Sequence, residues 1–483
     1  MKTIILGPPG TGKTTTLLNL VDEFIQQGIR PKQIGYFSFT KKAATEAANR
    51  AAEKFGLDID NDLTNFRTLH SYAFNQLGMT KEKMMKIEDY KEFGQKCGIP
   101  IRTANYSSED GTFNSDNEYL TIINTARVKR LDLLEYYDSR KNILDIERNT
   151  LFLLAEELER FKKEKGLKDF TDLLEDFIAK SLPGSLEVLF IDEAQDLSLI
   201  QWEMVRHLWK YAKKTYIAGD DDQAIFKWAG ADVDHFIALK EEVNDIKVLD
   251  QSYRIPGGPI HELSQKIINK VQNRFEKEYK PRDEIGLLKR YSDITQVDMS
   301  KGNWLVLSSA NYFLEDAKDL CEIQGWYYQC KGINSVPLKL LLALNNWEHW
   351  RKGELLNHLE IKNIYEYLGD NVLVGFQKGK TLHSDAKYTL KECQEQHGLL
   401  VSTVWYESFH GLDPMTETYI RNMRANGETL NKNPRIKMST IHAAKGGEAD
   451  NVLLLQDLTG AALETFSHDP DELHRLFYTG ATR

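Results

Sequence analysis

The sequence predicts an α/β fold with parallel sheets, and three observations predict it. Residues 3–6 form a short apolar run that leads directly into a glycine-rich loop and then into a helical pattern of apolar residues. Residues 186–191 and 215–218 are two further apolar runs, and clustered carboxylates follow each of them. Strands covered on both faces of a parallel sheet are apolar throughout, and open α/β sheets bind ligands beyond the carboxyl ends of their strands. We therefore expect a ligand site at these strand ends.

Length and composition limit the class of protein. The chain has 483 residues, too many for one hydrophobic core, so we expect three or four domains or subdomains. No apolar run approaches the ~20 residues of a membrane helix and no cleavage site follows the first residues, so we expect a cytoplasmic protein without a membrane partner. The formal net charge of -10 disfavours a generally positive surface, although nucleic acid needs only a local basic track. The four cysteines form no CxxC pair, so we expect neither a zinc site nor a disulfide framework.

The loop after the first strand fits the phosphate-binding pattern GxxxxGK[ST] in full. Its glycines let the backbone N–H groups face phosphate oxygens, and the N-terminus of the next helix adds partial positive charge. Lys13 would reach the β and γ phosphates, and Thr14 would hold Mg²⁺. The alternative is a glycine turn with an incidental lysine, which the strand, loop and helix context disfavours. The predicted nucleotide-binding residues here are Gly7, Pro8, Gly10, Thr11, Gly12, Lys13, Thr14 and Thr15.

The apolar run at residues 186–191 ends in Asp192 and Glu193. In P-loop hydrolases a carboxylate at this position holds Mg²⁺ through water, and a neighbouring glutamate can polarise the attacking water. The alternative is an acidic helix N-terminus, which the helix dipole would favour. The buried strand before these residues and the phosphate loop favour the catalytic interpretation.

The run at residues 215–218 is followed by GDDDQAIFKW, residues 219–228. Gln223 could reach the γ phosphate from this strand end. Trp228 lies five residues further on, where an indole could stack on a base and so couple hydrolysis to nucleic-acid contact. The alternative is that Trp228 fills a seam between domains, because tryptophan is highly buried on average.

With these residues taken together, the chain resembles the UvrD/Rep/PcrA group of superfamily 1 DNA helicases. Eight short motifs occur in the family's order along nearly the whole chain, together with a DFxDLL box. In that order the motifs I, Ia, Ib, II, III, IV, V and VI are residues 7–14, 37–44, 67–71, 192–196, 219–231, 249–254, 439–448 and 476–483, and the box is residues 169–174.

The resemblance implies roles for further residues. Motif arginines would contact the γ phosphate, a tyrosine ring would stack on adenine, and motifs Ia and Ib would touch single-stranded DNA. The expected catalytic residues are Asp192, Glu193, Gln223, Arg254 and Arg483. The expected additional nucleotide contacts are Tyr253 and Glu448. The expected nucleic-acid contacts are Phe39, Thr40, Thr68, His70, Trp228 and His442.

The resemblance also implies two RecA-like P-loop domains with parallel sheets, each interrupted by a mainly helical inserted subdomain. We expect these domains at residues 1–80 with 166–250 (1A), 81–165 (1B), 251–335 with 436–483 (2A) and 336–435 (a short 2B). Within 1B, residues 125–142 interleave basic and aromatic side chains, which suits a strand-tracking surface or, alternatively, a solvated helix face. The tryptophans at 347 and 350 are expected to be core residues.

The chain departs from the family pattern at five places. Only six residues precede Gly7, where the family has a glutamine that reads adenine, and Thr15 replaces a frequent arginine. We therefore expect GTP to be used within about tenfold of ATP, or ~1.4 kcal/mol. Ala229 and Gly447 replace larger family residues near the expected DNA path. The chain also stops at Arg483, so it is either a fragment or a form that dispenses with the last elements.

These patterns predict an ATP-driven translocase on single-stranded nucleic acid, and specifically a 3′–5′ DNA helicase that hydrolyses ATP between its two RecA-like domains. The polarity is implied by the resemblance alone. The expected cofactors are ATP and Mg²⁺; the expected partners are single-stranded DNA or a single/double-strand junction, with accessory loading proteins as further candidates. One alternative is a nucleotide-dependent nucleic-acid-binding switch of the same fold that unwinds nothing. A small-molecule P-loop kinase is a second alternative, which would not need motifs Ia, Ib, IV, V and VI.

Overall fold

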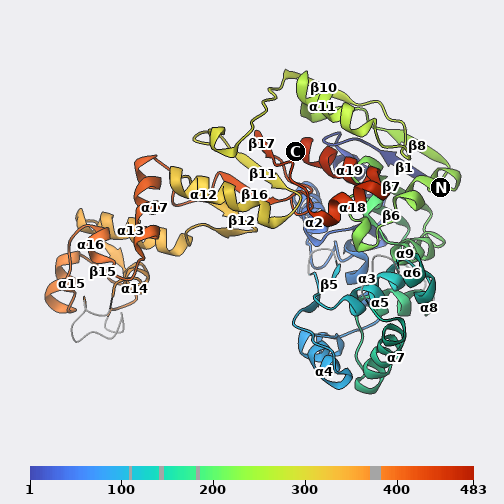
Figure 1. The fold of residues 1–483 in the computed structure, drawn as a ribbon, viewed down its shortest axis with the longest axis horizontal. Helices are drawn as coiled ribbons and strands as arrows, with labels where there is room; N and C mark the ends of the chain where they lie inside the picture. Colours follow the sequence, from blue (N-terminus) through green and yellow to red (C-terminus); the bar gives the residue numbers. More distant parts are fainter. Residues whose placement is uncertain (108–110, 141–145, 181–184, 370–371, 373–381) are drawn as a thin grey trace. The chain divides into compact units, whose positions relative to one another are not determined.

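The computed structural model describes residues 1–107, 111–140, 146–180, 185–369, 372 and 382–483 (Figure 1). Two compact units divide these residues: the first comprises residues 1–288 with 462–482, and the second comprises residues 289–461 with 483. Each unit contains a mainly parallel sheet and helices. None of the helices in the described ranges combines the length and apolar character that crossing a membrane requires.

The first unit is built on a six-stranded parallel sheet in the order β3-β2-β6-β7-β1-β8. Every residue of β2 and β6 is buried, as expected of strands covered on both faces. The expected strands at residues 3–6, 186–191 and 215–218 are therefore confirmed as β1, β6 and β7. The six strands are β1 (Lys2–Leu6), β2 (Ile34–Ser38), β3 (Phe66–Arg67), β6 (Val188–Asp192), β7 (Lys214–Gly219) and β8 (Asp245–Val248).

Helices cover both faces of this sheet. On one face, apolar residues of α1 and α2 pack with rings that project from β2, β6 and β7. On the other, Phe37 of β2 packs edge-on against Tyr72 of α3, which in turn contacts Phe177 of α8. The helices of this part of the unit are α1 (Lys13–Gln26), α2 (Lys41–Phe55), α3 (Leu69–Gln76), α8 (Phe170–Ala179), α9 (Leu199–Trp209) and α10 (Val233–Ala238).

A mainly helical segment with its own hydrophobic core lies between α3 and α8 in the sequence. Residues 125–142 were expected to track a strand or to form a solvated helix face. Two of their basic and aromatic residues, Arg127 and Tyr136, have structural roles instead. Arg127 forms ion pairs with Asp169 (2.8 Å), Asp172 (2.5 Å) and Glu175 (2.7 Å), and Tyr136 is buried. The elements of the segment between α3 and α8 are α4 (Ile87–Cys97), β4 (Ala104–Tyr106), β5 (Phe113–Ser115), α5 (Glu118–Val128), α6 (Leu133–Arg140) and α7 (Arg148–Lys165).

The first unit also contains a two-stranded sheet, β9 (Gln251–Gly257) with β10 (Lys280–Ile285), and the helices α11 (Pro259–Ile268) and α19 (Pro470–Ala481). Residues 251–288 and 462–482 thus group with the P-loop sheet, although the sequence placed both segments in 2A. The hydrogen bonds that join β9 to the phosphate loop, described below, explain this grouping. The division into four domains stays a prediction.

The second unit has a five-stranded sheet in the order β13-β12-β16-β11-β17, with only β13 antiparallel to its neighbour among these strands. The strand expected at residues 303–308 is confirmed as β11, and the following helix, α12 (Glu315–Gln324), begins after a 3₁₀ turn at residues 311–314. The strands are β11 (Trp304–Ser308), β12 (Tyr328–Cys330), β13 (Ile333–Asn334), β16 (Ile436–Thr440) and β17 (Asn451–Leu454).

A helical segment is inserted between β13 and β16. Trp347 and Trp350 of α13 are buried in the core that this segment shares with the sheet, so the core interpretation of both tryptophans is confirmed. The elements here are α13 (Leu338–Arg351), β14 (Leu356–Asn357), α14 (His358–Tyr365), β15 (Lys387–Tyr388), α15 (Leu390–Gln396), α16 (Trp405–Ser408) and α17 (Pro414–Ala425). After β17, α18 (Gly460–His468) leads to α19.

Candidate functional site

Three strand ends meet at one edge of the first sheet. The strands β6, β7 and β1 are neighbours and run parallel, so their carboxyl ends lie side by side. The phosphate loop follows β1, Asp192 ends β6, and residues 220–223 follow β7. The Gly7 amide donates a hydrogen bond of 3.3 Å to the Gly219 carbonyl, which joins the first of these segments to the third. The structure thus brings together the three elements that the sequence singled out.

The phosphate loop holds its own lysine. Gly10 and Gly12 have left-handed backbones, with φ of 76° and 80°, which glycine adopts without steric cost. The Lys13 ammonium donates to the Gly7 carbonyl at 2.7 Å, and the Thr11 hydroxyl donates to the Pro8 carbonyl at 2.9 Å. A buried ammonium is therefore kept satisfied beside the loop amides, at the N-terminus of α1, where an anion is stabilised.

The Asp192 carboxylate is buried and receives three hydrogen bonds. The hydroxyls of Thr14 and Tyr36 donate to the same oxygen, Oδ2, at 2.8 and 2.7 Å. The Glu193 amide donates to Oδ1 at 3.0 Å. Burial, followed by the neighbouring Glu193 carboxylate, raises the pKa of Asp192 above its ordinary value. A threonine hydroxyl and a carboxylate are the hard oxygen donors that Mg²⁺ takes beside phosphates, so Thr14 and Asp192 fit this ion.

Glu193 has a left-handed backbone, with φ of 54°, which is uncommon outside glycine and clusters at functional sites. Its Oε2 atom accepts a hydrogen bond of 2.6 Å from the side-chain Nε2 of Gln195. The side-chain Oε1 of Gln195 accepts a hydrogen bond of 2.9 Å from the backbone amide of Asp220. Gln195 therefore links the end of β6 to the end of β7 and fixes the direction of the Glu193 carboxylate.

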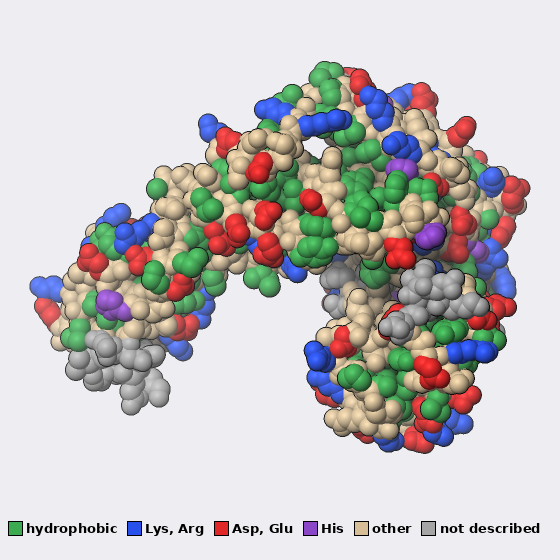
Figure 2. All heavy atoms as spheres, in the orientation of Figure 1, with side chains coloured by type: hydrophobic (Ala, Val, Ile, Leu, Met, Phe, Trp, Pro, Cys, Tyr) green, Lys and Arg blue, Asp and Glu red, His purple; other side chains and the backbone are tan. Residues whose placement is uncertain are grey.

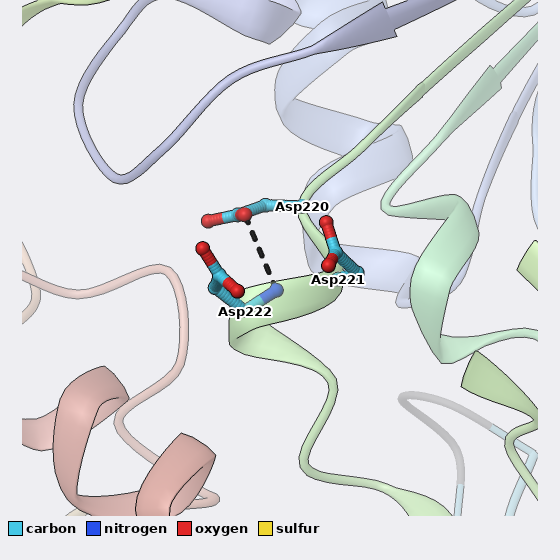
Figure 3. A group of neighbouring side chains, drawn as sticks. All are labelled: Asp220, Asp221 and Asp222. Atoms are coloured by element: carbon cyan, nitrogen blue, oxygen red, sulfur yellow. Dashed lines mark hydrogen bonds between the residues drawn. The ribbon is translucent and has the colours of Figure 1, made fainter. Parts of the chain in front are cut away.

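The three carboxylates of residues 220–222 lie together beyond β7 (Figure 3). They are close enough to hold a cation, but two basic side chains already form ion pairs with them. The fully buried Lys277 ammonium contacts Asp220 at 2.9 Å, Asp222 at 3.1 Å and Asp221, and Arg274 binds Asp222 through two hydrogen bonds of 2.8 and 2.6 Å. Burial raises the pKa of Asp221 to about 6, against the effect of Lys277. The cluster is an anchor for residues 274–277.

Gln223 is buried at the end of the same turn. Its side-chain nitrogen donates to Asp220 Oδ2 at 2.7 Å. Arg475 of α19 donates to the Asp221 carbonyl at 2.9 Å, so the turn is also tied to α19. Gln223 thus lies at the strand end that the sequence predicted, and its contact with a γ phosphate stays a prediction.

The strand β9 is bound directly to the phosphate loop. The Ser252 hydroxyl donates to the Pro9 carbonyl at 2.9 Å, and the Tyr253 amide donates to the Gly10 carbonyl at 2.9 Å. A Cβ atom at Gly10 would lie 2.4 Å from Cβ of Arg254, so only glycine allows this approach. The Tyr253 ring is 75% exposed and Arg254 is half-buried. The structure therefore places both residues beside the loop.

The predicted nucleic-acid contacts in the first unit differ in their exposure. Thr40 and Thr68 are N-caps of α2 and α3, and their hydroxyls accept amide hydrogen bonds at 3.1 and 3.3 Å. Phe39 and His70 are buried, against Phe226 and Phe170 respectively. These four residues have structural roles, and their contact with nucleic acid stays a prediction.

Trp228 is different because 49% of its surface is exposed. Trp228 is therefore no core residue of the first unit, and the alternative that it fills a seam between domains stays a prediction. On the face drawn in Figure 2, acidic and basic side chains are interspersed. An exposed indole can stack on a base. Among the predicted nucleic-acid contacts, stacking depends least on a positively charged surface.

Three predicted residues belong to the second unit: His442, Glu448 and Arg483. His442 is half-buried and Glu448 is exposed in the turn segment that follows β16, and Arg483 is buried after α19. Their predicted roles at the nucleotide and the nucleic acid stay predictions.

Two family models match the chain. The model of the UvrD/REP helicase N-terminal domain matches residues 1–244, which is half of the 483 residues, and the model of the UvrD-like helicase C-terminal domain matches residues 412–483. The chain belongs to the UvrD/REP helicase family. The family expected from the ordered motifs is confirmed, and so is an α/β fold with RecA-like parallel sheets.

Curated relatives of this UvrD/REP family member are named as helicases. It is 24% identical over 391 residues to the ATP-dependent DNA helicase Rep of Buchnera aphidicola, a match that covers 76% of the chain and 55% of the relative. It is 27% identical over 280 residues to ATP-dependent DNA helicase Rep of Escherichia coli, covering 53% of the chain and 39% of the relative. The match to a probable DNA helicase II homolog of Mycoplasma genitalium is 29% identical over 279 residues, covering 52% and 38%. The chain thus spans roughly half the length of these relatives or less.

Sequence reasoning missed three residues of the site in this UvrD/REP family chain. Tyr36 carries a hydroxyl within a mostly apolar stretch, β2, and this is the signal that could have drawn attention to it. That strand lies next to β6, which ends in Asp192. Gln195 lies inside motif II, where the motif alone indicates no separate role for it. Lys277 gave no signal, because it lies in an ordinary charged segment more than fifty residues after its partners.

Proposed function

We propose that this chain is an ATP hydrolase that moves along single-stranded DNA and unwinds duplex DNA with 3′–5′ polarity. The observation that carries the proposal is the gathering of Lys13, Thr14, Asp192 and Glu193 beyond the carboxyl ends of β1 and β6, which flank β7 in the parallel sheet. Membership of the UvrD/REP helicase family and the names of the relatives support it. A single/double-strand junction and accessory loading proteins are further candidate partners under the same proposal.

The residues at the strand ends suit hydrolysis of a nucleoside triphosphate. The loop amides and the Lys13 ammonium would bind the phosphates, in exchange for the hydrogen bond that Lys13 now makes to Gly7. Thr14 and Asp192 would hold Mg²⁺, which supplies positive charge against the phosphate oxygens. Glu193, which Gln195 holds in place, would orient and polarise the attacking water.

Residues of β9 would complete the nucleotide site. Tyr253 offers an exposed ring beside the loop, on which a purine could stack. Arg254 would stabilise the charge that develops on the γ phosphate, as Arg483 of motif VI would, and Glu448 of motif V would contact the nucleotide. His442 is proposed to contact the strand.

The coupling between hydrolysis and the strand would run through residues 223–228. Gln223 would sense the γ phosphate, and Trp228 would stack on a base at the other end of the same segment. Stacking on an aromatic ring contributes ~1–3 kcal/mol per base, which is enough to hold a strand and weak enough to release it each cycle.

Steady-state ATP hydrolysis with and without single-stranded DNA tests this function. We expect DNA to stimulate turnover and Lys13→Ala to abolish it. Single-stranded RNA is tested as a comparison. Duplexes with a 3′ or a 5′ single-stranded tail then test unwinding and its polarity. Slow hydrolysis that DNA does not stimulate, without unwinding, would instead support the nucleotide-dependent switch.

A further inference from the structure

Four aromatic rings form a continuous row across the first sheet. Strand register places Phe66, Tyr36, Phe190 and Tyr216 opposite one another on β3, β2, β6 and β7. Neighbouring ring centroids are 5.2, 6.1 and 5.3 Å apart, with interplanar angles of 9°, 27° and 14°. The row is buried beneath α1 and α2. The position of the Tyr36 ring is therefore fixed on both sides by stacking.

The row brings the Tyr36 hydroxyl to Asp192. In a strand, residues two apart project from the same face, so Phe190 and Asp192 lie on the face that carries the aromatic row. The Tyr36 ring stacks opposite Phe190, and its hydroxyl reaches one step along β6 to donate to Asp192 Oδ2 at 2.7 Å. Tyr216 stacks on the other side of Phe190 in the same row, with ring centroids 5.3 Å apart.

Tyr36 shares its acceptor oxygen with a residue of the phosphate loop. Thr14 donates to the same Oδ2 atom at 2.8 Å, and Thr14 is also the hydroxyl expected to face Mg²⁺. A hydroxyl coordinates a metal ion through its oxygen and still has its proton to donate, so Thr14 could keep its hydrogen bond to Asp192 while Tyr36 holds the same carboxylate oxygen from the neighbouring strand. Hydrogen bonds from such outer residues orient metal-binding carboxylates, and removing one costs ~10–100-fold in metal affinity or activity.

We propose that Tyr36 is a positioning residue that orients the Asp192 carboxylate toward Mg²⁺ in the nucleotide site. This inference rests on the proposed function, because it assigns Asp192 to the metal ion. Tyr36 acts through Asp192 and touches neither nucleotide nor metal. Its stacked ring supplies the rigidity, and its hydroxyl supplies the direction.

The variant Tyr36→Phe tests the inference because it removes the hydroxyl and keeps the stacked ring. Tyr216→Phe is the matched control, since it removes one hydroxyl from the same aromatic row on the other side of Phe190. The full chain is titrated with a fluorescent ADP analogue at a series of Mg²⁺ concentrations and in EDTA. The Mg²⁺ concentration that gives half of the metal-dependent change in ADP affinity is the main readout, and melting temperature is measured alongside.

We expect Tyr36→Phe to raise that half-effect Mg²⁺ concentration by ~10–100-fold. ADP affinity in EDTA should stay at the wild-type value, and Tyr216→Phe should match wild type in both measurements. An unchanged Mg²⁺ requirement in Tyr36→Phe would overturn the inference. So would an equal loss of ADP affinity in Mg²⁺ and in EDTA, which would mean that Tyr36 supports the fold of the site alone.

The failure of this inference can be told apart from failure of the proposed function. The binding titration needs no turnover, so it reports on Tyr36 even if the chain hydrolyses ATP slowly. A wild-type chain with no DNA-stimulated ATP hydrolysis contradicts the proposed function. If the wild-type chain hydrolyses ATP normally but Tyr36→Phe and Tyr216→Phe have the same half-effect Mg²⁺ concentration, only the inference is contradicted.

Discussion

The buried ammonium of Lys277 contacts all three carboxylates of residues 220–222. Lys277→Met would leave these buried carboxylates with Arg274 as the remaining cation. Removing one partner of a buried ion pair costs ~3–5 kcal/mol, so we expect a clear loss in the free energy of unfolding, measured by denaturant titration. Lys280→Met is the control, because Lys280 pairs with Asp250 at the surface and its loss should change stability little. Equal stabilities of the two variants would contradict the anchoring role.

Glu193 combines an unusual backbone with a fixed side-chain direction. Glu193→Gln should keep ATP affinity near wild type while turnover collapses, because a water-polarising carboxylate acts mainly in the transition state. Equilibrium binding and single-turnover hydrolysis separate the two effects. Glu203→Gln, which changes a glutamate paired at the surface with Arg130, is the control and should hydrolyse ATP normally. Wild-type turnover in Glu193→Gln would remove the assigned role.

The exposure of Trp228 decides what its removal should do. Since the indole is half-exposed, Trp228→Ala should leave the melting temperature and basal ATP hydrolysis nearly unchanged. Affinity for single-stranded DNA should fall by ~1–3 kcal/mol, together with the stimulation by DNA. The comparison is Trp347→Ala, which removes a fully buried ring and should destabilise the fold by ~3–5 kcal/mol. Unchanged DNA affinity in Trp228→Ala would end the stacking argument.

At the scale of elements, the contact between the phosphate loop and β9 depends on one glycine. Gly10→Ala adds a methyl group 2.4 Å from Cβ of Arg254, where the backbone is also left-handed. We expect β9 to be displaced, with lost nucleotide affinity in equilibrium titrations. Gly28→Ala is a matched control, because its φ of 89° is also left-handed but no atom lies within 4 Å of the added methyl. That variant should pay only the backbone cost of ~1–2 kcal/mol and bind nucleotide normally.

The same contact shows what local sequence patterns could predict and what they could not. The apolar runs at β1, β6, β7 and β11 are local signals, and the strands formed where they were expected. The bond between Ser252 and Pro9 joins residues 243 positions apart, and no periodicity within either segment encodes it. The grouping of β9, α11 and α19 with the first sheet was therefore missed. Tyr36 was missed for a related reason, since its partner is fixed by strand order and register.

At the scale of the molecule, each compact unit has hydrophobic clusters of its own. Cores of this kind can unfold separately, which departs from two-state behaviour. We expect differential scanning calorimetry to give a van't Hoff enthalpy below the calorimetric enthalpy. Repeating the scan on Lys277→Met should lower the transition of the first unit, which contains residue 277, more than that of the second. One two-state transition that moves as a whole would contradict this expectation.

Trp228 gives the protein a natural optical probe. Of the eight tryptophans, all within the described residues, Trp228 has the most exposed surface, at 49%. A collisional quencher such as acrylamide therefore reaches this indole in preference to the others. Protection of the quenchable fraction of tryptophan emission when a strand is added would report contact at residue 228 in the unlabelled, unmodified chain.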